Sequence, residues 1–285
     1  MLASACQVVT FEKFIHYMEL SILIPVYRYD CTQLVADLEA QGDALDIDYE
    51  LITADDEELR LGRAGIRNYL ADEAQGKYLL FIDCDAAVEN PHFIENYLKI
   101  ANMAEVVCGG LYHADELPSP SVSLRYRYEK EADKHRSARE RSRHPYDKFT
   151  TFNFLIKREV FQRIRFNEAC VGYGHEDTFF GAKLKECGIS ILHIDNPLRH
   201  DGLESNDHFL EKTREALRNL SRMADELKGH SPLLKTYSRL EYLGFNQALG
   251  DWFTANREWF ERKLRKRHPS LFLFKLYKLG YYCKL

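Results

Sequence analysis

The stretch Lys77–Pro91, "KYLLFIDCDAAVENP", places two aspartates, Asp83 and Asp85, at the end of an apolar run. The run "YLLFI" has the length and apolarity of a buried strand. On an extended segment alternate side chains face the same way, so we expect these two carboxylates about 7 Å apart on one face. Such a pair is consistent with a cap on a solvated turn, or with a site for Mg²⁺ or Mn²⁺, which prefer hard oxygen ligands.

The segments before this stretch predict an α/β fold. Strands are expected over residues 20–27 and within 48–58, the second ending in acids, and helices over 31–41 and 58–76. Strand, helix, strand, helix, strand with short connections is typical of a mostly parallel sheet wrapped by helices, whose ligands gather at the carboxyl ends of the strands. Each of the three strand ends carries aromatic or acidic residues. These are Tyr27, Asp55 with Asp56, and Asp83 with Asp85.

The remainder of the chain continues the alternation and then becomes helical. We expect a helix over residues 91–102, a strand over 105–113, a strand and helix within 149–166, a glycine-flexed loop and helix within 169–188, and a strand from 189. The charged segment 125–148 has no clean apolar face, which favours a mobile excursion or a solvated helix. Residues 207–228 have leucines at alternating spacings of three and four, which predicts one amphipathic helix.

Composition bounds the class of protein. With 45% hydrophobic and 29% charged residues in 285, the chain is ordinary globular material. Its seven cysteines are scattered and never spaced as C-x-x-C, so neither a disulfide framework nor a zinc site is indicated, and a reducing cytoplasm is expected. No apolar run reaches the roughly 18 residues of a membrane span. Residues 1–17 lack the features of a signal peptide, and we interpret them as an extension.

Charge is distributed unevenly along the chain. The formal net charge is −5, yet residues 125–148 hold nine Lys/Arg against five Asp/Glu, and residues 257–285 hold nine against two. An acidic body with two basic segments argues against nucleic-acid binding and for local contacts with anions, either diphosphates or an anionic membrane surface. The basic, aromatic tail suits adsorption to such a membrane. It suits equally a terminal helix that packs on the domain with a solvated basic face.

Four segments, taken in order, resemble the nucleotide-sugar-dependent glycosyltransferases of family 2. They are "LSILIPVYRYD", "YELITADDEE", "LGRAGIRNYLADEAQGKYLLFIDCDA" and "GYGHEDTFFGAKLKECG", and the resemblance spans about residues 20–203. It implies a GT-A fold with a nucleotide-binding half (18–112) and an acceptor-binding half (113–205), followed by a helical C-terminal extension (206–285). It also implies a divalent metal, Mn²⁺ or Mg²⁺, and inversion at the anomeric carbon of the sugar.

The resemblance assigns roles to residues on the donor side. It implies that Pro25 and Tyr27 line the nucleobase site, that Asp55 contacts the base, and that Arg67 and Asp83 lie near the nucleotide. A surface ion pair with Asp72 or Glu73 is the alternative for Arg67. The chain has "DDEE" where the family usually has Asp-Asp-Gly-Ser. In the D-x-D motif the second acid, Asp85, is the implied direct metal ligand.

On the acceptor side the loop "GYGHEDTFF" carries the implied chemistry. A sugar hydroxyl is a poor nucleophile, so a carboxylate has to accept its proton. Asp177 matches the family's base, and Glu176 matches an acceptor-binding partner; ordinary capping of a helix start is the alternative for both. Tyr173 is the aromatic candidate beside the acceptor sugar. His200 is the candidate imidazole ligand of the metal, with His193 as its competitor.

The sequence therefore predicts a metal-dependent, inverting glycosyltransferase that uses a nucleotide-sugar, expected to be a UDP-sugar. The expected acceptor is a saccharide or a lipid-linked glycan in surface polysaccharide or glycoconjugate assembly, and the expected location is the cytoplasm or the inner face of its membrane. Two alternatives stay open. A sugar nucleotidyltransferase would need a glycine-rich basic phosphate loop, which "PVYRYDCTQ" lacks, whereas a non-catalytic carbohydrate- or nucleotide-binding protein would need no base. No G-x-G-x-x-G follows a strand, which disfavours an oxidoreductase.

Overall fold

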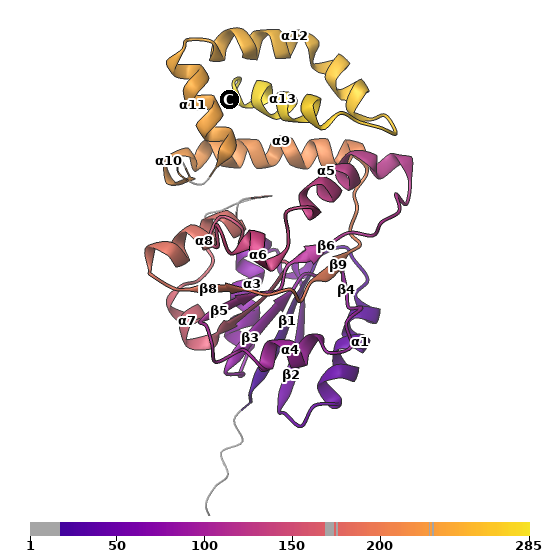
Figure 1. The fold of residues 1–285 in the computed structure, drawn as a ribbon, viewed down its shortest axis with the longest axis vertical. Coiled ribbons are helices and arrows are strands. Elements are labelled where there is room, and N and C mark those ends of the chain that lie inside the picture. The colour runs from indigo at the N-terminus through magenta and orange to yellow at the C-terminus, as the bar shows by residue number, and fades with distance from the viewer. Residues whose placement is uncertain (1–17, 169–173, 175, 228, 230) are drawn as a thin grey trace, which may run out of the picture.

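The computed structural model describes residues 18–168, 174, 176–227, 229 and 231–285. An α/β body carries a separate layer of helices on one side (Figure 1). The strands are β1 (Leu20–Val26), β2 (Tyr49–Asp55), β3 (Tyr78–Ile82), β4 (Ala86–Ala87), β5 (Val106–Cys108), β6 (Leu111–Tyr112), β7 (Asn153–Lys157), β8 (Ile191–His193) and β9 (Leu198–His200). The body's helices are α1 (Thr32–Asp43), α2 (Asp56–Leu59), α3 (Gly62–Glu73), α4 (Phe93–Leu98), α5 (Ser123–Asp133), α6 (Ala138–Arg141), α7 (Arg158–Arg163) and α8 (Glu176–Glu186).

The main sheet has the strand order β2-β1-β3-β7-β5-β8. Strand β1 pairs in parallel with β2 and β3, and β5 with β8, whereas β7 runs antiparallel to both of its neighbours. All five residues of β3 are buried. Leu79 and Phe81 belong to one apolar cluster, and Leu80 and Ile82 to another. Alternate side chains therefore enter cores on opposite faces, which is why β3 is apolar throughout. The predicted mostly parallel α/β sheet is confirmed.

A second, three-stranded sheet lies at the carboxyl end of the main one, in the order β4-β9-β6. Ala86 of β4 pairs with His200 of β9, and Tyr112 of β6 pairs with Arg199 of β9. The residues that flank these pairs, Asp85 and His113, therefore come to lie beside His200. This small sheet joins three parts of the chain that are far apart in sequence.

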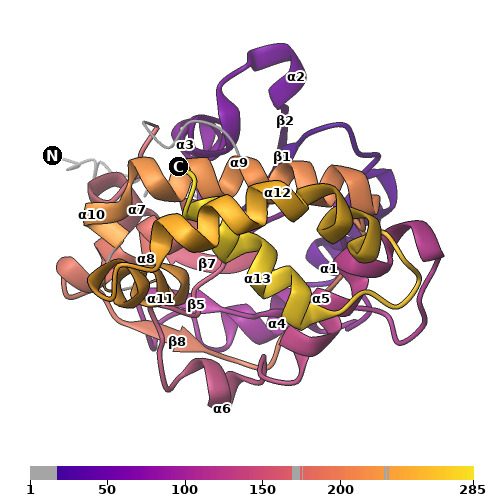
Figure 2. The ribbon, with the colours of Figure 1, turned by 90° about the horizontal axis from the view of Figure 1, so that it is seen from above.

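The C-terminal layer consists of α9 (Asn206–Arg222), α10 (Ala224–Leu227), α11 (Pro232–Tyr242), α12 (Asn246–Leu264) and α13 (Leu271–Tyr282). Viewed from above, α9, α12 and α13 cover the body (Figure 2). The single helix expected over 207–228 is interrupted at Met223, where α9 ends. The tail is a terminal helix in the structure, because α13 buries Phe274 and Tyr277 in a cluster that also holds Leu124 of α5.

The charged segment 125–148 is neither an unstructured excursion nor a wholly solvated helix, so that prediction was wrong. It forms most of α5 and all of α6, and it buries Glu129 and Arg141. The buried face is polar and ion-paired. A search for apolar periodicity could not detect it for that reason.

Candidate active site

A cavity of about 430 Å³ opens at the carboxyl end of β3. Its walls come from the body and from α9 of the C-terminal layer. The lining residues are Arg63, Asp83, Asp85, Leu111, His113, Arg125, Tyr128, Glu129, Arg136, Thr150, Thr151, Phe152, Gly174, Glu176, Asp177, Thr178, His200, Gly202, Glu204 and Lys212. Five of the residues selected from the sequence meet here: Asp83, Asp85, Glu176, Asp177 and His200.

Asp83 and Asp85 lie in a turn, not on an extended segment. The amide of Ala86 donates to the carbonyl of Asp83 at 3.1 Å, which closes the turn between β3 and β4. The expectation that both carboxylates project from one face of a strand was therefore wrong in its geometry, because the chain leaves the sheet at Ile82. Both carboxylates line the cavity nonetheless.

The carboxylate of Asp83 is held by Arg67 of α3, which forms an ion pair with it. The Arg67 side chain is 3% exposed, and its guanidinium also donates to the carbonyl of Arg63 at 2.9 Å. Arg67 is thus a buried partner of the D-x-D turn. Arg67 does not form the alternative surface ion pair with Asp72, since Asp72 pairs with Arg165.

Asp85 contacts His200, with 3.1 Å between Oδ2 and Nε2. Burial favours the neutral form of Asp85, but the bond to His200 and the charges of His200 and Arg63 outweigh it, so the pKa of this carboxyl is lowered. Gly202 lies against the same carboxylate. A Cβ there would overlap the Asp85 oxygen, so this approach requires glycine.

Behind His200 stands a histidine that the sequence reasoning did not select. His113 Nε2 is 3.0 Å from His200 Nδ1, and His113 Nδ1 is 3.1 Å from Asp133 Oδ1. Burial lowers the pKa of His113. The pKa of the Asp133 carboxyl is lowered as well, because hydrogen bonds from His113 and Arg136 outweigh the effect of burial. A usable signal was present, since His113 is the polar last residue of the strand predicted over 105–113.

Across the cavity, α8 begins with Glu176 and Asp177. Glu176 forms an ion pair with Arg63 at 2.6 Å. The charges of Arg63 and Arg67 overcome the effect of burial and lower the pKa of the Glu176 carboxyl. Asp177 has the opposite behaviour, because burial and then the Glu176 charge raise its pKa to about 6. The pair therefore holds one firmly ionised acid and one carboxylate that titrates near neutral pH.

Three donor-side residues, Pro25, Tyr27 and Asp55, lie at the same end of the main sheet but, unlike Asp83, do not line this cavity. Val26 pairs with Asp55, so Pro25, Tyr27 and Asp55 all reach the carboxyl edge. Tyr27 is 52% exposed. The Asp55 carboxylate accepts from the Glu57 amide at 2.8 Å and caps α2.

Two remaining candidates are not placed at the site. Tyr173 lies outside the described residues. His193 is turned away from the cavity, because Arg141 donates to its Nδ1 at 2.7 Å and its Nε2 is 2.9 Å from the carbonyl of Pro145. His200, not His193, is the histidine beside Asp85.

Within the described part of the chain no group of three or more His, Cys, Asp or Glu side chains is arranged around a common metal position. Asp85 and His200 supply two donors. Two adjacent ligand atoms of an octahedral ion, each about 2.1 Å from it, are about 3 Å apart. The 3.1 Å separation between Asp85 Oδ2 and His200 Nε2 fits two such ligands. The remaining positions would go to water or phosphate oxygens, as is usual for Mg²⁺ and Mn²⁺.

The sheet with its single antiparallel strand β7, the D-x-D turn after β3 and the acidic start of α8 facing it across one cavity define a domain of the GT-A class. Residues 44–165 match the sequence profile described as Glycosyl transferase family 2. This segment, less than half of the chain, is similar to the family 2 glycosyltransferases, the family that the sequence motifs resemble. No curated protein matches the chain in sequence.

Several solved structures are similar in architecture. The mannosyltransferase PcManGT from Pyrobaculum calidifontis, in complex with GDP-Man and Mn²⁺, is 14% identical, with a TM-score of 0.47, 73% of this chain and 64% of that chain covered. TarS from S. aureus is 16% identical, with a TM-score of 0.48 and 86% and 49% covered. Glucosyl-3-phosphoglycerate synthase from Mycobacterium tuberculosis, with Mn²⁺, UDP-Glc and glycerol 3-phosphate, is 16% identical, with a TM-score of 0.47 and 72% and 80% covered. The chain thus spans less than two thirds of the first two, and such likenesses define neither a substrate nor a metal for it.

Proposed function

We propose that this protein is a metal-dependent, inverting glycosyltransferase that moves a sugar from a UDP-sugar to a hydroxyl of a saccharide or lipid-linked saccharide. The observation that carries the proposal is the convergence of Asp177 and the Asp85–His200 pair on one cavity. The reaction requires a base and donors that bind a cation. The cavity has the base on one wall and the donors on the other. A protein that only binds carbohydrate or nucleotide would need no carboxylate with a raised pKa.

Asp177 is the proposed base. With a pKa of about 6 it is mostly ionised at pH 7.5, yet it is a stronger base than an ordinary aspartate. Its carboxylate takes the proton of the acceptor hydroxyl as that oxygen bonds to the anomeric carbon. The bond from the anomeric carbon to the diphosphate oxygen breaks in the same step, and attack from the opposite side inverts the configuration.

On the donor side, Pro25, Tyr27 and Asp55 would hold the nucleobase, with the exposed Tyr27 ring available for stacking. Arg67 acts through Asp83, which it orients toward the nucleotide. Asp85 and His200 would hold Mn²⁺ or Mg²⁺, which supplies charge neutralisation for the departing diphosphate. Glu176 stays ionised beside Arg63. In this proposal it orients the acceptor, together with Tyr173.

The proposal is tested by a thermal-shift panel of nucleoside diphosphates and UDP-sugars, with and without Mn²⁺. A ligand at 100 times its dissociation constant adds about 2.7 kcal/mol to the free energy of unfolding. For a chain of this size that raises the melting temperature by several degrees. We expect UDP to stabilise the protein only with Mn²⁺, and Asp85→Ala to abolish the effect. Absence of a response to every nucleotide would refute the proposal.

Catalysis is tested separately by sugar transfer with the nucleotide-sugar that the panel selects. Asp177→Asn should lower kcat by about 10²–10⁴-fold, the usual contribution of a general base, while UDP and Mn²⁺ still bind. Asp72→Asn, a surface aspartate paired with Arg165, is the matched control and should keep full activity. Full transfer by Asp177→Asn would show that Asp177 is not the base. Binding without transfer by the wild-type protein, across all donors and acceptors tried, would favour the non-catalytic alternative.

We further propose that the C-terminal layer adsorbs to the inner face of an anionic membrane. Phe272 is 73% exposed on α13, within a segment, 257–285, that is rich in Lys and Arg. Of the described helices none is both long and apolar enough to span a membrane. Co-sedimentation with vesicles containing phosphatidylserine, compared with neutral vesicles, tests this contact. Phe272→Asp should weaken it, and equal binding to both vesicle types would refute it.

A further inference from the structure

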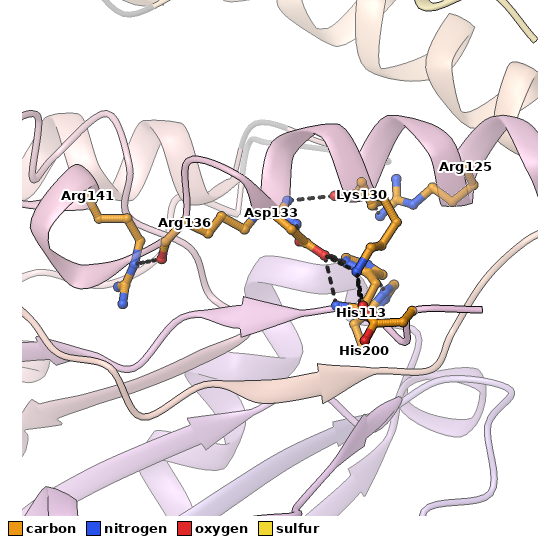
Figure 3. Close-up of polar contacts among 9 residues, drawn as sticks. His113, Arg125, Lys130, Asp133, Arg136, Arg141 and His200 are labelled. Atoms are coloured by element: carbon orange, nitrogen blue, oxygen red, sulfur yellow. Dashed lines mark hydrogen bonds and ion pairs between the residues drawn. The ribbon is translucent and has the colours of Figure 1, made fainter. Parts of the chain in front are cut away.

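Two imidazoles stand in series between two carboxylates on one side of the cavity. The order is Asp133, His113, His200 and Asp85, and three contacts of 3.0 to 3.1 Å join them. Figure 3 shows His113 and His200 together below α5, with Asp133 above them. The proposed base, Asp177, lies on α8, so this chain of contacts has a different role from proton abstraction.

The rules for hydrogen-bond donors and acceptors give this series of contacts a direction. Asp133 is ionised and accepts only, so His113 Nδ1 carries a proton toward it. In a neutral imidazole the other nitrogen is then an acceptor, so His113 Nε2 accepts from Nδ1–H of His200. This leaves the lone pair of His200 Nε2 facing the carboxylate of Asp85 at 3.1 Å. Two acceptors at that distance repel each other unless a positive centre, a proton or a metal ion, lies between them.

We propose that His113 and Asp133 are positioning residues that hold His200 in its Nδ1–H tautomer, so that Nε2 presents its lone pair beside Asp85 to a divalent cation. The inference rests on the proposed metal-dependent function. It adds to that function two residues that touch neither the metal nor the sugar. In other metal sites, loss of such an outer partner typically lowers metal affinity by 10–100-fold.

Further contacts hold the Asp133 end of this series of hydrogen bonds in place. Asp133 also accepts from Arg136 at 2.6 Å and lies 3.8 Å from the ammonium of Lys130. Arg136 is anchored in turn by Glu129, at 2.6 Å. The backbone of His113 is held from both sides, because its amide donates to Asp133 and its carbonyl accepts from Lys130. These contacts leave the His113 ring little freedom to turn (Figure 3).

The opposite direction is the competing arrangement. A doubly protonated His113 would donate from Nε2 to His200 Nδ1, and His200 would then donate from Nε2 to Asp85. In that state the protonated His113 ring would be a third cation near Asp133, beside Arg136 and Lys130. His113 is only 2% exposed. Burying a further charge there is unfavourable, so the structure favours the direction given above.

The tautomers are read directly by two-bond ¹⁵N–¹H correlation NMR of the imidazoles in the full-length, metal-free protein at pH 8. The proposal expects a proton on Nδ1 of both His113 and His200 and a bare Nε2 in His113; without the metal, a proton on His200 Nε2 lies between that atom and Asp85. A proton on His200 Nε2 with a bare Nδ1 would overturn it. This measurement requires no metal and no activity, so its result is valid whether or not the proposed function is correct.

Metal affinity is measured by electron paramagnetic resonance of free Mn²⁺ during titration. We expect His113→Ala and Asp133→Ala each to weaken Mn²⁺ binding by about 10–100-fold. His113→Gln should restore most of the loss, because its amide oxygen can accept from His200 Nδ1–H in place of the ring. His193→Gln removes another buried histidine, away from the cavity, and should leave the affinity unchanged.

The outcomes separate the two proposals. Wild-type affinity in His113→Ala would overturn the positioning role, even if transfer is metal-dependent. A loss of equal size in His193→Gln would overturn it too, because general damage to the fold would then explain the effect. If the wild-type protein binds no Mn²⁺ while the NMR gives the expected tautomers, the metal dependence fails and the tautomer assignment stands.

Discussion

Asp85 and His200 are 115 positions apart in the sequence, and their side chains are 3.1 Å apart in the structure. The pairing of Ala86 with His200 in the small sheet brings them together. Asp85 precedes the short strand β4, and His200 ends β9, so neither residue depends on a long flexible loop for its position. The geometry of this pair is therefore a property of backbone hydrogen bonding, and it responds to changes in the nearby backbone.

Gly202→Ala should disrupt this pair. The new methyl group would overlap the Asp85 carboxylate and force it away from His200. We expect Mn²⁺ affinity, measured by calorimetry, to fall about tenfold or more, in the range seen when metal ligands lose their orientation. Gly229→Ala adds a methyl group with no atom of the described residues within 4 Å and serves as the control. Unchanged affinity in Gly202→Ala would argue against Asp85 as a ligand.

The pH dependence of transfer should report Asp177. Because its pKa is raised to about 6 and the base acts as the carboxylate, kcat/KM should fall as the pH drops through about 6. The Glu176 charge contributes to that raised value. Glu176→Gln should therefore move the acidic limb to lower pH, whatever it does to the maximal rate. An acidic limb that stays in place, or moves up, would contradict the assignment.

The same raised pKa carries a cost in stability. Above pH 6 the folded protein holds an ionised carboxylate that its surroundings disfavour, and the unfolded chain has no such cost. Asp177→Asn should therefore increase the free energy of unfolding at pH 7.5 by about 1–3 kcal/mol, since one pKa unit corresponds to about 1.4 kcal/mol. The gain should shrink as the pH falls through 6 toward 4, where both states are protonated.

Denaturant unfolding at pH 7.5, 6.0 and 5.0 measures this trend. Asp72→Asn is the comparison, because a hydrogen bond from Arg165 lowers the pKa of Asp72 and its neutralisation should bring no gain. Destabilisation of Asp177→Asn at pH 7.5 would show that the carboxylate is favoured where it lies.

Arg141 should be a major contributor to stability. Its guanidinium is buried and donates to the carbonyls of Cys108, Gly109 and Ile194, which joins α6 to the ends of two strands. Arg141→Leu removes all three bonds, although the Cys108 and Gly109 carbonyls each keep an amide donor, from Ile194 and Asn196. Hydrogen bonds to a charged group contribute about 1.5–3 kcal/mol each, so we expect a loss of about 3 kcal/mol or more.

The exposed neighbour on the same helix provides the control for this variant. Arg139→Leu should change the free energy of unfolding by less than about 0.5 kcal/mol, as is usual for surface substitutions. Urea titration followed by circular dichroism measures both variants. Equal effects of the two substitutions would refute the structural role of Arg141.

The amino-acid sequence alone predicts the order of strands and helices in the first half of the chain and the positions where polar side chains leave the sheet. Buried strands such as Tyr78–Ile82 need unbroken apolar residues, and parallel strands bring the residues after them to one edge, so Asp83, Asp85 and Asp55 could be placed without coordinates. The family motifs then pointed to Asp177 and His200.

Which of these groups meet depends on the tertiary structure. Asp85 reaches His200 through a sheet of strands two and three residues long, too short to leave a periodic pattern in the sequence. His113 and Asp133 join them beside α5, a helix that buries the charged Glu129, which pairs with Arg136. Apolar periodicity indicates the side chains that pack in a hydrophobic core. Contacts between opposite charges produce no such periodicity, so they are identified only from the tertiary structure.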